Sequence, residues 1–132
     1  MILYRAAKAG FCFGVKRAIE LAEKTARDRD GPIYSLGHII HNTQVVEQLS
    51  QQGIIKIDSL DEAMAGGTLL LRSHGEGSDI IQQAQDKSLD IIDTTCPFVS
   101  KAQKIAATMA AEGKKVVIVG DRNHPEVKGI MA

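Results

Sequence analysis

The chain is poor in the residues and segments that mark several protein classes. Its 132 residues contain no tryptophan, three prolines and two cysteines, and aromatic residues make up 4% of the sequence. Two cysteines without a C-x-x-C pair fit neither a disulfide scaffold nor the zinc-finger and thioredoxin patterns. No apolar run is long enough to cross a bilayer. Because Arg5 and Lys8 interrupt the first residues, no signal-peptide pattern is present, and we expect a cytoplasmic chain with reduced thiols.

The chain also carries no net charge at pH 7. Sixteen basic residues balance sixteen acidic ones, whereas a general nucleic-acid-binding domain needs a basic surface. Nucleic acid and membranes are therefore not expected partners, although a local anion pocket remains compatible with this balance. The sequence contains neither a G-x-G-x-x-G fingerprint nor a P-loop, so nicotinamide and ATP binding have no support from motifs.

What the sequence does contain is an alternation of strand-like and helix-like segments. Apolar residues make up 44% and charged residues 24% of the chain, which is ordinary for a globular protein. The hydrophobic periodicity predicts helices over 15–26, 42–52 and 78–87, a short helix opened by a capping box at Ser59, a helix after Pro97, and strands over 2–7, 33–36, 54–57, 68–72, 89–93 and 116–119. Such alternation predicts an α/β fold of right-handed βαβ units around a parallel sheet.

Two smaller expectations concern side-chain placement. In the helix after Pro97, the spacing predicts that Ala102, Ile105, Ala106 and Met109 face inward. The neighbouring cations Lys16 and Arg17 are expected to be solvated charges.

Five soft or titratable side chains fall where a predicted strand passes into a predicted helix: Cys12, His41, His74, Cys96 and His124. In a parallel α/β sheet these junctions share the rim formed by the carboxyl ends of the strands, which is where ligands bind. Five such side chains on one rim predict a metal or cofactor site that handles an anion.

The two cysteines are candidate metal ligands. Both precede a predicted helix, and the partial positive charge of a helix amino terminus favours the thiolate, which is the form that binds iron or zinc. The alternative is that Cys12 and Cys96 are small buried residues, since cysteine is among the most often buried residue types.

The histidines are candidate phosphate ligands. Imidazoles beside the free N–H groups of helix starts form a good phosphate cradle, although any one of them can equally be a solvated loop residue. His38 lacks this placement and is expected to be structural. Glu126 follows His124 by two residues, so it could donate protons in the same pocket or simply stabilise a helix dipole after Pro125.

Five segments in this order resemble one known family. They are Ala9-Gly10-Phe11-Cys12-Phe13-Gly14-Val15, Leu36-Gly37-His38-Ile39-Ile40-His41-Asn42, Arg72-Ser73-His74-Gly75, Asp93-Thr94-Thr95-Cys96-Pro97 and Gly120-Asp121-Arg122-Asn123-His124-Pro125-Glu126. Together they resemble the amino-terminal half of the hydroxymethylbutenyl diphosphate reductases (the IspH/LytB family). The resemblance covers essentially the whole chain, and the combination of five motifs is far more specific than each motif alone.

The resemblance implies an activity and roles for these residues. The family catalyses the last step of the non-mevalonate isoprenoid pathway, a two-electron reductive dehydroxylation that makes isopentenyl and dimethylallyl diphosphates. By motif match, Cys12 and Cys96 would be two of three ligands to a 4Fe–4S cluster, and His41, His74 and His124 would contact the diphosphate. Glu126 would supply the proton that lets the hydroxyl leave as water. An external electron donor such as ferredoxin or flavodoxin is also implied.

The resemblance further implies three α/β lobes, of which this chain would supply the first and the start of the second. Residues 1–13 would be a first strand and a cysteine loop that packs with the last lobe, 14–96 the first lobe, and 97–132 the start of the second. The third cysteine of the family pattern is absent, so we expect these 132 residues alone neither to hold a complete cluster nor to turn over substrate. Glu76 stands where the family pattern has an apolar residue, and His38 also departs from it.

Two other interpretations remain open at this point. One is a non-catalytic α/β module that binds phosphate or a metal without redox chemistry. The other is a zinc hydrolase that uses cysteine and histidine ligands, although the spacing fits no common zinc pattern.

Overall fold

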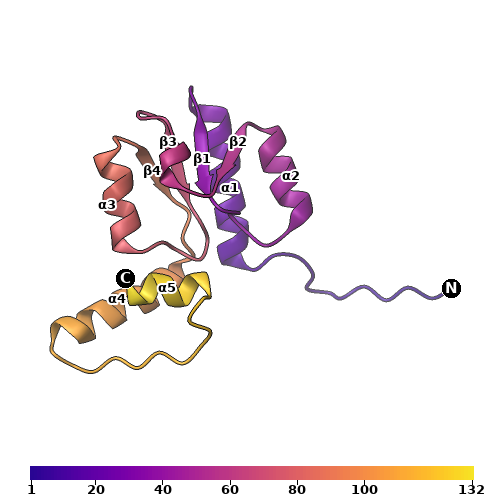
Figure 1. The fold of residues 1–132 in the computed structure, drawn as a ribbon. Helices are drawn as coiled ribbons and strands as arrows, with labels where there is room; N and C mark the ends of the chain where they lie inside the picture. Colours follow the sequence, from indigo (N-terminus) through magenta and orange to yellow (C-terminus); the bar gives the residue numbers. More distant parts are fainter.

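Four short parallel strands form the centre of the molecule (Figure 1). The structure is a computed structural model that describes residues 1–132. Strands β1 (Ile33–Leu36), β2 (Ile54–Ile57), β3 (Thr68–Leu71) and β4 (Asp90–Asp93) lie in the order β2-β1-β3-β4, and each neighbouring pair is parallel. The predicted α/β fold with a parallel sheet is therefore confirmed.

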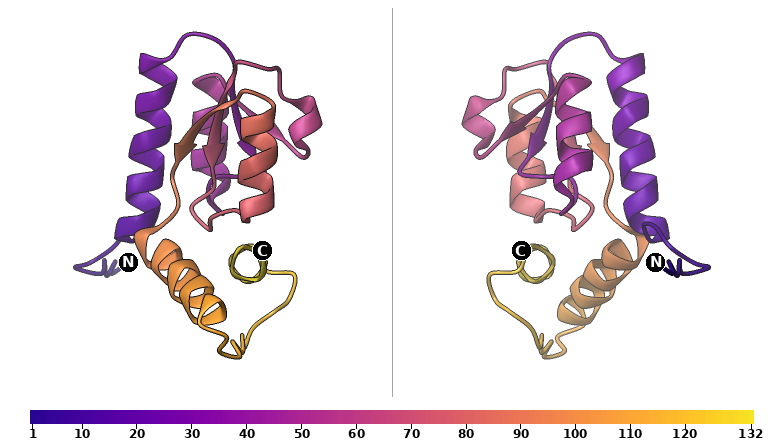
Figure 2. Two further views of the ribbon diagram at one scale, coloured as in Figure 1. Left: turned by 90° about the vertical axis from the view of Figure 1, so that its left-hand side faces the viewer. Right: turned by 90° about the vertical axis from the view of Figure 1, so that its right-hand side faces the viewer.

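Helices cover both faces of this sheet (Figure 2). Helices α1 (Phe13–Asp28) and α2 (Thr43–Gln51) pack on one face, and α3 (Ser78–Asp86) packs on the other with the 3₁₀ turn η1 (Leu60–Glu62). Each lies within two residues of its predicted range. The capping box predicted at Ser59 is present, and its helix is a single 3₁₀ turn.

The sheet separates two apolar cores because successive side chains of a strand point to opposite faces. On β1, Ile33 joins the core under α1 and α2, whereas Tyr34 joins the core under α3. On β3, Leu70 and Leu69 divide in the same way, and both are fully buried. Strand β3 is buried at all four positions and reads as a nearly continuous apolar run, which is why its position was predictable.

Two further helices lie beyond the carboxyl ends of the strands, α4 (Pro97–Ala111) and α5 (Pro125–Met131) (Figures 1 and 2). The predicted inward face of α4 is wrong: no residue of this helix is buried, and Ile105 is 51% exposed. The reason is that α4 packs mainly against α5 and not on a face of the sheet. None of the helices combines the length and the apolarity needed to cross a membrane.

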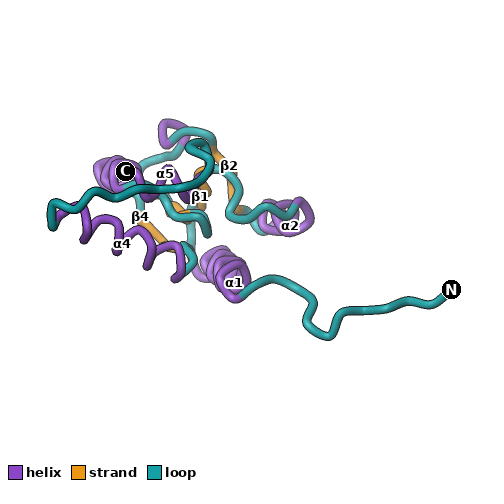
Figure 3. Tube along the Cα trace, turned by 90° about the horizontal axis from the view of Figure 1, so that it is seen from below, coloured by secondary structure: helices purple, strands orange, loops and turns teal.

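The strands predicted over 2–7 and 116–119 are wrong. Residues 1–12 carry no helix or strand and extend away from the body of the molecule (Figures 1 and 3). Residues 116–119 are likewise without regular structure, with Val117 76% and Val119 96% exposed. A β-strand needs a neighbour to pair its backbone hydrogen bonds, and neither segment pairs with any of the four strands.

Candidate functional site

The residues singled out from the sequence all lie near the rim formed by the carboxyl ends of the strands. His41, His74 and Cys96 follow β1, β3 and β4 as predicted. Cys12 and His124 precede α1 and α5 as N-cap residues, but the strands predicted before them are absent, so these two do not lie at strand-to-helix junctions. Helix α1 runs antiparallel to the strands, and its first residue consequently lies at the same rim (Figure 1).

Three imidazole rings cluster at this rim. The ring centroids of His41 and His74 are 4.7 Å apart with an interplanar angle of 38°, and those of His74 and His124 are 5.9 Å apart with an angle of 87°. His74 is the central ring and is partly buried, whereas the outer two are exposed. Three histidines separated by up to 83 positions in the sequence are thus neighbours in space.

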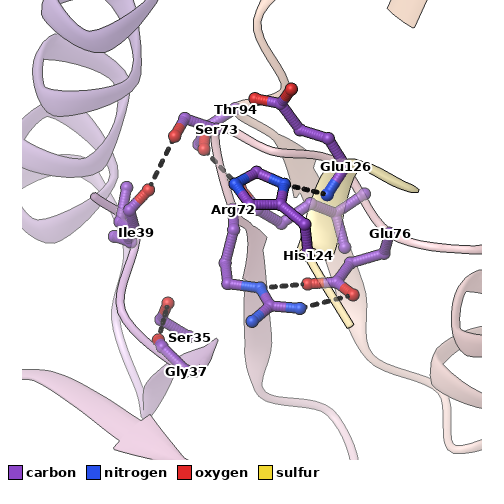
Figure 4. A network of polar contacts seen from close by, with 10 residues as sticks. Ser35, Gly37, Ile39, Arg72, Ser73, Glu76, Thr94, His124 and Glu126 are labelled. Atoms are coloured by element: carbon purple, nitrogen blue, oxygen red, sulfur yellow. Dashed lines mark hydrogen bonds and ion pairs between the residues drawn. The ribbon is translucent and has the colours of Figure 1, made fainter. Parts of the chain in front are cut away.

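Backbone hydrogen bonds connect the loops that carry His41 and His74. Both the backbone nitrogen and the hydroxyl of Ser73 donate to the carbonyl oxygen of Ile39, at 3.2 and 3.0 Å (Figure 4). The turn after β3 is closed by Gly75, whose N–H donates to the carbonyl of Arg72 at 2.9 Å. Gly75 has a φ of +75°, which a glycine adopts without steric cost.

His124 has a defined hydrogen-bonding role. As the N-cap of α5, its Nδ1 accepts a hydrogen bond from the backbone nitrogen of Glu126 at 3.3 Å (Figure 4). When Nδ1 accepts, the neutral ring carries its proton on Nε2. Nε2 is then a donor that can reach an anionic ligand.

The environment of His74 disfavours its charged form. Burial is the largest cause that lowers the pKa of His74 below its ordinary 6.5, and the charges of His41, Arg72 and His124 act in the same direction. The carboxylate of Glu126 opposes them, which places Glu126 within electrostatic reach of this ring. His74 is therefore mainly neutral at pH 7, and a bound polyanion would favour its protonation.

The two cysteines are free thiols at the starts of α1 and α4. Neither is fully buried, so the alternative of two small core residues does not describe them. Neither side chain caps its helix, which leaves the first N–H groups of both helices available to another acceptor. A Cβ atom added at Gly14 would lie only 2.4 Å from the sulfur of Cys96, so the start of α1 lies directly against that thiol.

The cysteine and histidine parts of the rim are physically connected. The backbone nitrogen of Cys96 donates to the carbonyl of Ser73 at 2.9 Å, immediately before His74. Arg17 donates from Nη1 to the carbonyl of Thr95 at 3.1 Å. The expectation that Arg17 is a solvated charge is therefore wrong, because this contact joins residues 78 positions apart, a separation over which local sequence carries no signal.

Gln103 is a further residue that sequence reasoning missed. It extends from α4 between two glycines, Gly75 beside His74 and Gly129 in α5. Added Cβ atoms at these glycines would lie 2.7 and 2.6 Å from its Nε2 atom. This nitrogen is buried without a hydrogen-bond partner. The glutamine lies next to Ala102 on a helix where the sequence reasoning followed the apolar residues, so no pattern marks it.

The donor atoms decide which metal sites the chain could form. No three His, Cys, Asp or Glu side chains are close enough together to hold a metal ion, so the rim is not a preformed zinc site. The two accessible thiols fit two ligands of an iron–sulfur cluster, which is bound through thiolates. The sequence holds no third cysteine.

Comparison with known proteins identifies the family. The family described as "LytB protein" matches residues 3–132. The chain belongs to the LytB family. The resemblance predicted from the five motifs is thereby confirmed.

Curated relatives and solved structures agree with this assignment to the LytB family. A 4-hydroxy-3-methylbut-2-enyl diphosphate reductase of Geobacter sp. strain M21 is 48% identical over 94% of this chain, and one of Geobacter metallireducens is 46% identical over the whole of this chain. The E-1-hydroxy-2-methyl-but-2-enyl-4-diphosphate reductase structure from Plasmodium falciparum matches 94% of the chain with a TM-score of 0.90 and 36% identity.

A second solved reductase, described as the terminal enzyme of the non-mevalonate pathway, matches 93% of the chain with a TM-score of 0.84 and 42% identity. The matched region makes up 44% and 46% of the two Geobacter proteins, and 39% and 43% of the two solved chains. This LytB-family chain thus spans less than half the length of these relatives.

Proposed function

We propose that this chain forms the amino-terminal part of a 4-hydroxy-3-methylbut-2-enyl diphosphate reductase. In this proposal, residues 14–96 are a first lobe, residues 97–132 begin a second, and residues 1–13 contact a later part of the polypeptide. The observation that carries the proposal is the cluster of three imidazoles next to a turn whose Ser73 carbonyl accepts a hydrogen bond from Cys96, with Gly14 of the Cys12 segment lying against the sulfur of Cys96. That combination suits a ligand with a polyanionic end and a reducible end.

The reaction removes an allylic hydroxyl by reduction. Two electrons and two protons enter, the C–O bond breaks, one proton leaves with the hydroxyl as water, and the other is added to carbon. Isopentenyl and dimethylallyl diphosphates differ only in which allylic carbon receives that proton. The electrons come from an external protein donor of the ferredoxin or flavodoxin class.

His41, His74 and His124 would bind the diphosphate. The Nε2–H of His124 and the N–H groups at the nearby helix starts are donors for phosphate oxygens. His74 would be neutral before binding and would take up a proton when the polyanion arrives, because a nearby negative charge favours the imidazolium. His74 thus gains positive charge when the anionic ligand binds.

Glu126 would deliver the proton that the departing hydroxyl needs. Its carboxylate acts electrostatically on His74, and its backbone is bonded to His124. It consequently lies beside the proposed diphosphate site, where a carboxylic acid can reach the other end of a small allylic substrate.

Cys12 and Cys96 would hold a 4Fe–4S cluster together with a third cysteine supplied from elsewhere in the polypeptide. When bound, such a cluster supplies electrons to the substrate. With only two of the three thiolates, the 132 residues alone should neither retain a complete cluster nor turn over substrate. Reduced thiols also suit a cytoplasmic location.

The cluster is tested by purifying the intact protein without oxygen. We expect bound iron and sulfide and a visible absorption band near about 400 nm, which thiolate–iron ligation produces. Replacement of Cys12 or Cys96 by serine should remove the colour, whereas Ser78→Ala, a small change at an exposed position, should leave it intact. A colourless, iron-free intact protein would contradict the reductase, and one that still bound pyrophosphate would support a non-catalytic module.

The acid role of Glu126 is tested by Glu126→Gln in the same intact protein. We expect the cluster to be retained and turnover to fall by about 10²–10⁴-fold, the usual contribution of a positioned general acid. Iron content and steady-state rates measure the two quantities separately. Unchanged turnover would refute the role of this carboxylate in proton delivery.

A further inference from the structure

An ion pair encloses the turn that carries His74. Arg72 and Glu76 each lie two residues from this histidine, and their side chains meet with Nε–Oε1 at 2.5 Å and Nη2–Oε2 at 3.0 Å (Figure 4). The two parallel contacts make the pair bidentate. The family resemblance leads us to expect an apolar residue at position 76, so the sequence did not predict this pair.

The pair also reaches the loop that leads to His41. The guanidinium of Arg72 lies against Gly37, where an added Cβ atom would be 3.0 Å from Nη1. Gly37 is the first residue after β1 and has a φ of +75°. The guanidinium of Arg72 is thus hydrogen-bonded to Glu76 across the His74 turn and lies against the loop that leads to His41. The ring centroids of His41 and His74 are 4.7 Å apart.

This pair differs from the ion pairs on the surface. The side chain of Glu76 is 7% exposed and that of Arg72 is 23% exposed, whereas in the Lys16–Glu20 pair the corresponding values are 70% and 62%. Exposed pairs contribute little to stability. A bidentate, largely buried pair is stronger and more directional, and removing one partner leaves the other charge uncompensated.

We propose that Arg72 and Glu76 are positioning residues that hold His74 against His41 in the arrangement that binds a diphosphate. The inference rests on the proposed function for the identity of the ligand. Neither residue needs to touch the ligand, because the turn between them carries the imidazole that does. An apolar residue at position 76 could not form this link.

The test uses the 132-residue chain with inorganic pyrophosphate as the probe. Glu76→Gln and Arg72→Met are compared with wild type and with Glu20→Gln, which breaks an exposed pair of the same i,i+4 spacing. We expect both turn variants to bind pyrophosphate about tenfold more weakly by calorimetry, equivalent to about 1.4 kcal/mol. We also expect them to lose the nuclear Overhauser effect between the His41 and His74 rings, while Glu20→Gln retains both.

The outcomes separate this inference from the proposed function. If wild type binds pyrophosphate and the variants bind it equally and keep the ring-to-ring effect, the positioning role is overturned and the proposed function stands. If wild type does not bind, the diphosphate site is overturned, and persistence of the ring-to-ring effect in the variants would overturn the positioning role separately. Should the single variants unfold by circular dichroism, Arg72→Met/Glu76→Met, which leaves no unpaired charge, must show the same losses.

Discussion

His74 is the residue that combines partial burial, nearby charges and a proposed role in ligand binding. It is the most enclosed of the three clustered imidazoles; burial, His41, Arg72 and His124 lower its pKa, while Glu126 raises it. Such a ring stays neutral until an anion arrives. The same property links the protonation of His74 to the stability of the folded chain.

Acidification should destabilise the chain through His74. The pKa of His74 is lowered in the folded state, so the unfolded state binds the proton more readily. The stabilising contribution is therefore fully present above the unfolded pKa of about 6.5. It is lost as the pH falls from there through the lower pKa of the folded state. We expect the free energy of unfolding, measured in urea, to fall less between pH 7.5 and 5.5 in His74→Gln than in wild type.

The exposed His38, which lies outside the cluster, is the matched control for this experiment. His38→Gln should follow the wild-type pH dependence. If His74→Gln also followed it, the enclosed state of His74 would be contradicted.

At the scale of elements, the site depends on how closely α4 approaches the turn after β3. Gln103 of α4 lies over Gly75, and the N-cap nitrogen of α4 is bonded to Ser73 in the same turn. Helices α4 and α5 thereby close over the rim although neither contributes to the cores of the sheet. The predicted stripe on α4 was misleading because apolar periodicity indicates a face to be covered without saying what covers it.

Gly75→Ala should damage this approach. An alanine with φ near +75° costs about 1–2 kcal/mol, and its Cβ atom would also collide with Gln103. Because the amide of Gln103 is the flexible end of its side chain and Thr95 Cγ2 at 3.1 Å must also shift, we expect a loss of unfolding free energy somewhat larger than the backbone cost alone, together with weaker pyrophosphate binding. Urea denaturation and calorimetry measure the two effects.

Gly113 provides the control, because it has a φ of +74° and nothing lies within 4 Å of its added Cβ atom. Gly113→Ala should show only the backbone cost and normal pyrophosphate affinity. Equal destabilisation by the two substitutions would contradict the close packing of Gln103.

At the scale of the whole molecule, burial is distributed unevenly. Both apolar cores lie within the sheet and the helices α1, α2 and α3. Residues 97–132 contain no buried residue, and residues 111–124 are all exposed. Opening of a segment requires little free energy where few apolar contacts are lost, so the two regions should differ in local stability.

Native-state hydrogen exchange measures this difference. We expect the amides of β1 and β3 to exchange only on global unfolding, and those of α4 and α5 to exchange many times faster. Limited proteolysis should cut within the exposed residues 1–12 and 111–124 before it cuts the helices and strands between residues 13 and 93. Equal protection of the amides of α4 and β3 would contradict this expected difference in local stability. It would also argue against residues 14–96 unfolding separately from residues 97–132.

Much of this fold was predictable from local pattern. Buried strands such as β3 form unbroken apolar runs, and α2 ends before the glycine at 53 as its sequence indicates. The segments at 2–7 and 116–119 carry strand-like patterns too, but a strand forms only when a neighbour pairs with it, and local sequence does not contain the neighbour.

The sequence by itself determined the fold class, the family and the residues to examine, because hydrophobic periodicity and the ordered motifs are local properties of the chain. Only the tertiary structure decided how close the rings of His41, His74 and His124 come, that Gly14 lies against the thiol of Cys96, and that Arg72 and Glu76 enclose the central turn. Those distances depend on packing between segments far apart in the chain, and such packing leaves no periodic trace in the sequence.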